Sequence, residues 1–253
     1  DQASAIVANT AKVSGATNIN GLSDALLEGY SVYIGNDPSS SITSAEYNVA
    51  IGTNAMDAIT TGSNNTAVGT SSLTENSTGN GNAASGVNSL KSNTTGNYNT
   101  ATGVNSLYTN TTGDNNTAVG GNALYANTIG TRNIAFGYYA GDIITTGSNN
   151  VMLGYGTDPS AVDGTNQTAI GYAATGQTDN SVTLGNDDVT KVYMAEDAGA
   201  TVYAAGLNLG GTAVTATAAE LNLIDGVTSS VQAQLDAKTG ITTDQASAIV
   251  ANT

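Results

Sequence analysis

Asn48-Val49-Ala50-Ile51-Gly52 is the stretch that decides the fold, because close variants of it return along the chain every 17 residues. The glycines that close each variant mark the period: Gly35, Gly52, Gly69, Gly86, Gly103, Gly120, Gly137, Gly154 and Gly171, with Gly185 after a shorter step of 14. A second glycine series keeps the same step at Gly62, Gly79, Gly96, Gly113, Gly130, Gly147 and Gly164. Fixed self-similarity at so short a period predicts a solenoid.

Each repeat predicts one coil of two short strands and two turns, since 17 residues are too few for a pair of helices. Val49 and Ile51 flank Ala50, an alternation typical of a strand with one bulky face and one face in a tight space. We expect the repeated glycines to supply positive φ at the turns. Two further columns recur at the same step: the apolar Met56, Leu73, Leu90, Leu107 and Leu124, and the predicted asparagine ladder Asn76, Asn93, Asn110 and Asn127.

The apolar columns are thin for a chain of this length. Large side chains occupy only two lines along the coils, so a single copy would bury little apolar surface against the entropy of ordering its backbone. Packing several copies side by side, with the bulky face turned inward, is the natural remedy. The sequence therefore predicts an obligate oligomer.

Composition excludes several classes of partner and chemistry. The net charge is −15 with only five Lys and Arg, so we expect no nucleic acid and no anionic membrane surface as partner. The chain has no Cys and no His, which removes disulfides, the common zinc sites and histidine-based catalysis. Only Lys91 and Arg132 lie within the coils and no acidic cluster meets either, so we expect no enzyme. No apolar run is long enough for membrane insertion.

The first ten residues return unchanged at 244–253, a displacement of 243, which indicates one period of a tandem array and the start of the next unit. Ile6, Asn9 and Val13 have coiled-coil spacing, and a capping box at 217–220 precedes a further apolar series. The predicted domains are a helical coiled-coil stalk at 1–28, a parallel β-roll of about ten coils at 29–188, a β connector at 189–213 and a helical stalk at 214–253, in which 244–253 begins the next unit.

The lead-ins at 48–52 and 181–186 resemble the YadA-like heads of trimeric autotransporter adhesins. The resemblance implies a mainly β fold: a homotrimer of left-handed parallel β-rolls joined to short α-helical coiled-coil stalks. Residues 6–13 are similar to the stalk motif of that family, in which core asparagines bind an anion on the trimer axis. Carried over residue by residue, the resemblance implies Asn9 and Asn252 as anion ligands for chloride or another halide, with no other cofactor. The alternative for Asn9 is a polar residue that fixes register.

The Asn-Thr-Thr-Gly insertions at 93–96 and 110–113 and the stretch at 215–222 look more like bacteriophage tail-fibre proteins. The expected function is that of a structural unit of an extracellular trimeric fibre, a surface adhesin or filament that extends from a cell and mediates attachment. Its expected partners are its own copies, the adjoining tandem units and a surface receptor that the sequence does not name. The alternative is the shaft or receptor-binding protein of a virion tail fibre.

A group of tyrosines falls at one place on successive coils: Tyr138, Tyr139, Tyr155 and Tyr172. Two interpretations stay open. The rings form a strip that binds sugar or another surface, or they pack the end coils against each other and the connector. An ice-binding surface is a further class, but it needs flat rows of Thr-x-Thr, and only Thr100 with Thr102 offers one.

Two smaller groups also leave alternatives. Asp179, Asp187 and Asp188 are either calcium ligands or solvated carboxylates at turns. The sequons that begin at Asn76 and Asn110 are either glycan acceptors or a by-product of the Asn- and Thr-rich repeat.

Overall fold

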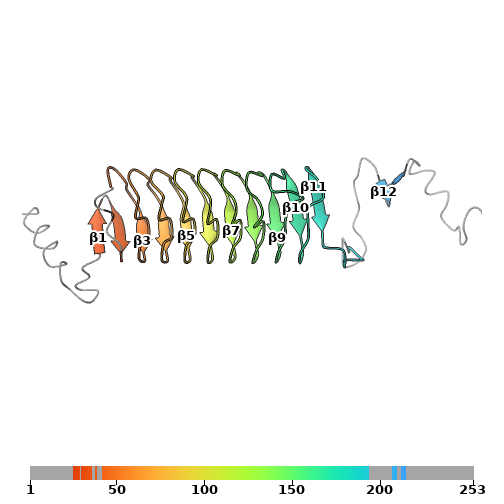
Figure 1. Ribbon diagram of the computed structural model, residues 1–253, viewed down its shortest axis with the longest axis horizontal. Helices are drawn as coiled ribbons and strands as arrows, with labels where there is room; N and C mark the ends of the chain where they lie inside the picture. The colour runs from red at the N-terminus through yellow and green to blue at the C-terminus, as the bar shows by residue number, and fades with distance from the viewer. Residues whose placement is uncertain are drawn as a thin grey trace, which may run out of the picture. The chain divides into compact units, whose positions relative to one another are not determined.

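A computed structural model describes residues 25–28, 30–35, 38, 42–193, 207–209 and 212–214. The chain divides into two compact units, Asp1–Val192 and Tyr193–Thr253. In the first unit the strands stand side by side and successive coils follow one another along the roll (Figure 1). The predicted solenoid is therefore confirmed.

The strands of the roll form one sheet in chain order. Its first strand, β1 (Ala25–Glu28), pairs antiparallel with β2 (Ser31–Ile34), and every later pair is parallel. The later strands are β3 (Val49–Ile51), β4 (Thr66–Val68), β5 (Ala83–Ser85), β6 (Thr100–Thr102), β7 (Thr117–Val119), β8 (Ile134–Phe136), β9 (Val151–Leu153), β10 (Gln167–Ile170) and β11 (Ser181–Leu184). In the second unit β12 (Leu207–Leu209) pairs antiparallel with β13 (Thr212–Val214).

The register confirms the period. Ala50 lies opposite Ala67, 17 residues on, and the same step holds between all parallel neighbours up to β10. The last pair aligns Ala169 with Thr183, which is the shorter step of 14. Each coil thus places every residue beside its counterpart in the next coil.

Small residues fill the strand side of the interior, as the sequence predicts. Ala50 at the centre of β3 is fully buried, whereas its neighbours Val49 and Ile51 point outward and are exposed. The same pattern of one buried residue between two outward ones recurs in β4 to β9. The second apolar column lies inside as well, since Met56, Leu73, Leu90, Leu107 and Leu124 are all fully buried.

The prediction of two strands per coil is wrong, because the leucine side of each coil is a run of turns. Leu90 has φ 50° and Asn88 has φ 58°, so the backbone there alternates into the left-handed region and cannot extend. A non-glycine residue in that region costs about 1–2 kcal/mol. Stacking offsets the cost, since the Leu90 amide donates to the Ser106 carbonyl of the next coil at 3.0 Å.

The two glycine series serve different purposes, which corrects the prediction that both supply positive φ. Gly52 and its counterparts have φ near 135°, which side chains rarely adopt. The second series, represented by Gly79 and Gly96, has no positive φ. A Cβ on Gly96 would instead fall within 3.0 Å of the Asn93 side chain and of the Gly113 carbonyl. The second series is therefore required for close approach between coils.

Two asparagine ladders run inside the roll. The predicted one is confirmed: Asn93 donates to Asn76 at 2.8 Å, Asn110 to Asn93 at 2.8 Å and Asn127 to Asn110 at 2.7 Å. Isoleucines end it on both sides, at positions 59 and 144, so the Oδ1 of Asn127 is buried without a partner among the described residues.

The sequence did not predict the second ladder, which uses the asparagine before each strand: Asn48, Asn65, Asn82, Asn99, Asn116, Asn133 and Asn150. All seven are buried. Asn99 shows their common pattern: its Oδ1 accepts the backbone N–H of Asn116 at 2.9 Å, and its Nδ2 donates to the Gly113 carbonyl at 2.8 Å. Each asparagine thus ties its coil to the following one.

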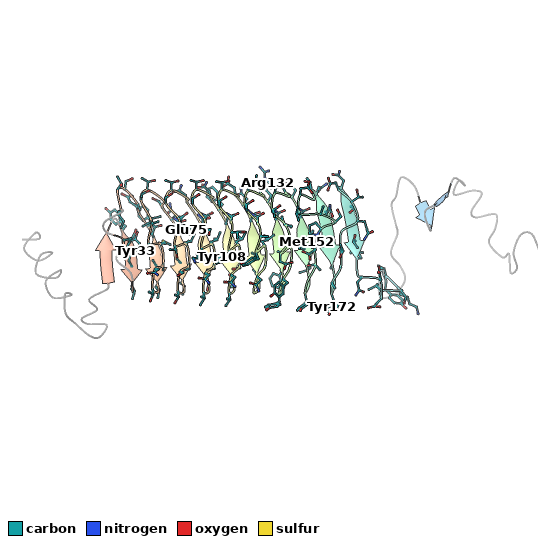
Figure 2. The ribbon with its side chains drawn as sticks, in the orientation of Figure 1. Tyr33, Glu75, Tyr108, Arg132, Met152 and Tyr172 are labelled. Carbon is teal, nitrogen blue, oxygen red and sulfur yellow. The ribbon has the colours of Figure 1, made fainter. Side chains whose placement is uncertain are left out.

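One coil exchanges large for small inside the roll. Met152 takes the place of the strand alanine, and Gly141 takes the place of the leucine on the opposite side. A Cβ on Gly141 would lie 3.4 Å from Met152 and 3.1 Å from Leu124, so the methionine fills the space that a leucine leaves. Figure 2 shows Met152 within the body of the coil.

The predicted flanking segments fall largely outside the described residues. Of the helical stalk predicted at 1–28, only 25–28 is described, and it forms the strand β1 instead of a helix. Residues 189–193 of the predicted connector contain no strand, and the β12–β13 pair ends at Val214, the first residue of the second predicted stalk. The described residues include no helix long and apolar enough to cross a membrane.

Candidate functional site

The outward side of the strands is the most apolar surface of the roll. We call the residues on either side of each buried strand centre, from β3 to β11, the strand face. Its exposed large members are Val49, Ile51, Val68, Ile134, Phe136, Leu153, Ile170, Val182 and Leu184. Phe136 is 55% exposed and Val182 is 69% exposed, which is unusual for side chains of this kind in a protein that works alone.

The strand face is also free of charge. No Asp, Glu, Lys or Arg occurs in any strand from β2 to β11, although the chain carries a net charge of −15. The apolar side chains are interrupted at β5 and β6, where Ala83, Ser85, Thr100 and Thr102 take their places. The face therefore consists of two apolar stretches with a small, polar stretch between them.

The tyrosine group divides into a stack and one edge contact. The rings of Tyr138 and Tyr155 lie 5.9 Å apart, and those of Tyr155 and Tyr172 lie 5.5 Å apart, nearly parallel in both cases. Tyr139 meets Tyr138 edge-on, with ring centres 4.5 Å apart. Figure 2 shows Tyr172 at one edge of the roll, while Arg132 lies at the opposite edge.

The stack is a poor platform for sugar. A sugar ring packs on the face of an aromatic ring, but parallel rings on successive coils cover one another's faces and present their edges and hydroxyls to solvent. Of the two interpretations from sequence, the geometry supports packing between coils.

The acidic group near the end of the roll does not gather. Asp179 accepts hydrogen bonds from the Thr165 amide at 2.7 Å and from the Gln167 side chain at 2.9 Å. These bonds lower its pKa below the ordinary value, with the backbone bond as the larger cause. Asp187 and Asp188 are exposed on the following turn. In the described part of the chain no three acidic, His or Cys side chains lie close enough to hold a metal ion.

The sequons that begin at Asn76 and Asn110 are closed to glycans in the folded chain. Both asparagines are fully buried, and their side-chain amides donate to the Gly79 and Gly113 carbonyls. A transferase therefore cannot reach either amide without unwinding the coil.

A carboxyl pair that sequence reasoning missed lies between two coils. Burial raises the pKa of Asp158 to about 6, and the charge of Asp142 raises it further. Burial also raises the pKa of Asp142. Oδ1 of Asp158 is buried, and when both groups are ionised neither can donate to the other. A proton on Asp158 can be donated to Asp142, so the pair favours sharing one proton. The sequence signal is Asp142 itself, which interrupts the column of Tyr108 and Tyr125.

This pair predicts a stability that falls as pH rises. The pKa of Asp158 is about 6 in the folded chain against 3.8 ordinarily, so between these values the folded state binds more protons than the unfolded state. Its contribution is complete below the ordinary pKa and is lost as pH rises through about 6. We expect a loss of about 1 kcal/mol between pH 5 and pH 7.5, after discounting for partial exposure.

Asp158→Asn tests this prediction, because an amide keeps a donor toward Asp142 and carries no charge. Urea unfolding at a series of pH values should give a flatter profile for Asp158→Asn than for the unaltered chain. Asp163→Asn, which removes an exposed carboxylate five residues away, is the matched control and should keep the original slope. Equal slopes for all three proteins contradict the assignment.

The predicted anion ligands Asn9 and Asn252 lie outside the described residues. The structure therefore does not place them together or apart. Comparisons with known protein families, with curated proteins and with solved structures found no match. What the chain does must be argued from the strand face and the coils themselves.

Proposed function

We propose that the chain is a structural unit of an extracellular homotrimeric fibre, a surface adhesin or filament that mediates attachment. The observation that carries the proposal is the uncharged, apolar strand face along a narrow roll. In this trimer three left-handed rolls lie parallel and turn their strand faces toward a common axis, so that each covers the apolar rows of the other two.

A second copy of this chain is the partner that fits the face best. Successive coils repeat at one spacing along the roll, and an identical roll offers the same spacing, so each outward residue meets an equivalent row along the whole length. Chains with a net charge of −15 repel one another, but the strands of the face carry no charge, so burying it brings no like charges together there.

The ten residues repeated at 244–253 support an end-to-end array of such units. In that array the predicted stalks join successive rolls, and Asn9 and Asn252 bind a halide on the trimer axis. Many identical units on one fibre give attachment by multivalency, since weak contacts made together hold far better than each contact alone.

Light scattering coupled to size-exclusion chromatography tests the oligomer. One chain has a mass of 25.1 kDa, and we expect about 75 kDa, three times that value, without smaller species on dilution. A stable, folded single chain at all dilutions contradicts the proposal. Electron microscopy of several joined units should then show straight segments separated by thin stalks.

Phe136→Asp with Leu153→Asp locates the interface. Both residues are exposed on the strand face, and two carboxylates there are expected to break the trimer. Thr95→Asp with Thr112→Asp adds the same charge at exposed positions outside the strands, also on adjacent coils, and should leave the mass unchanged. A trimer that survives the first pair of substitutions contradicts the interface, and circular dichroism shows whether dissociated chains remain folded.

A further inference from the structure

Stacked tyrosines recur at three places along the roll, always between residues 17 apart. Tyr30 stacks on Tyr47 with ring centres 5.4 Å apart, and Tyr108 stacks on Tyr125 at 5.3 Å, each pair with planes inclined by only 10°. The third place is the row of Tyr138, Tyr155 and Tyr172. The coil register holds each pair together, so two phenol rings remain neighbours for as long as the roll is folded.

These rings also reach solvent. Tyr172 is 69% exposed, Tyr155 52% and Tyr138 48%, so a reagent in solution has access to their edges and hydroxyls. The interior of the coils is closed without them, by alanine on one side and leucine on the other. The stacks are therefore accessible, reactive groups fixed side by side on a rigid support.

We propose that the tyrosine stacks are sites of oxidative coupling, in which a carbon–carbon bond joins tyrosines of neighbouring coils. The co-reactant is hydrogen peroxide used by a haem peroxidase. Each of two phenols gives up one electron and one proton, and the two radicals join through the ring carbons beside their oxygens. The hydrogens on those carbons move to the oxygens, which restores both hydroxyls, and the peroxide is reduced to two waters. The proposal does not depend on the number of chains in the fibre.

The three places differ in how readily they lose an electron. The ammonium of Lys91 lies 5.4 Å from the centre of the Tyr108 ring and 3.4 Å from its hydroxyl oxygen. A positive charge at this distance opposes removal of an electron from the ring. No Lys or Arg ring contact of this kind is found at Tyr138, Tyr155 or Tyr172 within the described residues. Coupling is therefore fastest in the row of three.

The bond would act as a staple along the roll. It closes a loop of one coil, so the unfolded chain loses freedom while the folded chain keeps its geometry. It also prevents one coil from peeling away from the next. A fibre that bears load gains a covalent connection parallel to its axis without a cysteine, which the chain lacks.

Tyr155→Phe and Tyr98→Phe form the matched pair that tests the proposal. Tyr155→Phe keeps a ring in the middle of the row but removes the oxidisable phenol, so it breaks both links at once. Tyr98 is 66% exposed and its ring lies over Gly81, with no tyrosine stacked on it among the described residues. Removing it takes away a reactive phenol of similar exposure that has no partner.

The intact protein is treated with peroxidase and hydrogen peroxide, and the coupled peptides are mapped by mass spectrometry. We expect bonds between residues 17 apart, fastest at the Tyr138 row, and a loss of coupling there of about tenfold or more in Tyr155→Phe, since fixed neighbours react far faster than freely diffusing ones. Tyr98→Phe should couple like the unaltered chain, and oxidised chains with Tyr155 intact should unfold at a higher temperature than oxidised Tyr155→Phe.

Two results overturn the proposal. In the first, coupling passes through Tyr98 as readily as through the stacks. In the second, the bonds join different chains, which a denaturing gel shows as covalent dimers and trimers. Absence of coupled tyrosine in the treated, folded protein also rules it out.

Discussion

Gly96→Ala is expected to destabilise the roll by about 3 kcal/mol or more, although alanine suits the backbone conformation there. The added Cβ meets the Asn93 side chain and the Gly113 carbonyl, both within 3.0 Å. Neither can withdraw, because Asn93 is bonded to Asn110 in the ladder and the Gly113 carbonyl accepts from Asn99 and Asn110. Denaturant unfolding at one fixed chain concentration measures the loss.

Gly156→Ala is the matched control. Gly156 has φ 57°, so alanine is strained there, but no atom lies within 4 Å of the position of the added Cβ. Its expected cost is about 1 kcal/mol, the price of the left-handed conformation alone. Equal losses in the two variants show that lack of room is not what requires glycine at position 96.

Asn99→Ala is expected to cost about 3 kcal/mol, because it leaves a buried donor without an acceptor. The Oδ1 of Asn99 accepts the backbone N–H of Asn116 at 2.9 Å, and no other acceptor for that N–H occurs among the described residues. The Gly113 carbonyl also loses one of its two side-chain donors. Buried on all sides, these groups have no water to replace the lost bonds.

Asn80→Ala removes the same side chain from a half-buried position. Its Oδ1 accepts the Ser63 amide at 2.9 Å, which is the equivalent bond between coils. Water reaches this place, so the expected loss is below about 1 kcal/mol. The difference in unfolding free energy between Asn99→Ala and Asn80→Ala measures burial of the ladder, and a difference near zero contradicts the role given to it.

The repeat itself made most of the fold predictable. Once the period is 17, each residue's neighbour in the next coil follows from counting, so the parallel register, the buried alanines, the Asn93 ladder and the short last step between Gly171 and Gly185 were all accessible from sequence. None of these depends on the shape of a single coil. They follow from translation along the roll.

The course of the chain within one coil was not predictable in the same way. Single-residue preferences place Leu90 in a strand or helix, and only the hydrogen bond to the next coil makes its left-handed conformation acceptable. Asn99 precedes a strand and looks like a turn residue, until the direction of the turn places its side chain inside. The exposed strand face agreed with the predicted bulky side, because alternation alone fixes which residues share a face.

Departures from the repeat were the least predictable. Met152 and Gly141 look like two unrelated exceptions in sequence, yet they fill one shared space. Asp142 and Asp158 occupy different positions in their coils, and only the fold brings their carboxyls together. For the predicted anion ligands, Asn9 and Asn252, the hypothesis rests on the resemblance of the stalk motif alone.

The uniform step between coils gives the gene an easy way to change the reach of the protein. Removing or duplicating 17 codons within the regular part, between Gly52 and Gly137, returns every later residue to a column of its own kind. Recombination between such similar stretches adds or deletes one rung at a time, each about 4.8 Å long. Any other number of residues would move leucines into the asparagine columns. The distance spanned by the roll is thus free to evolve in fixed increments while its cross-section stays constant.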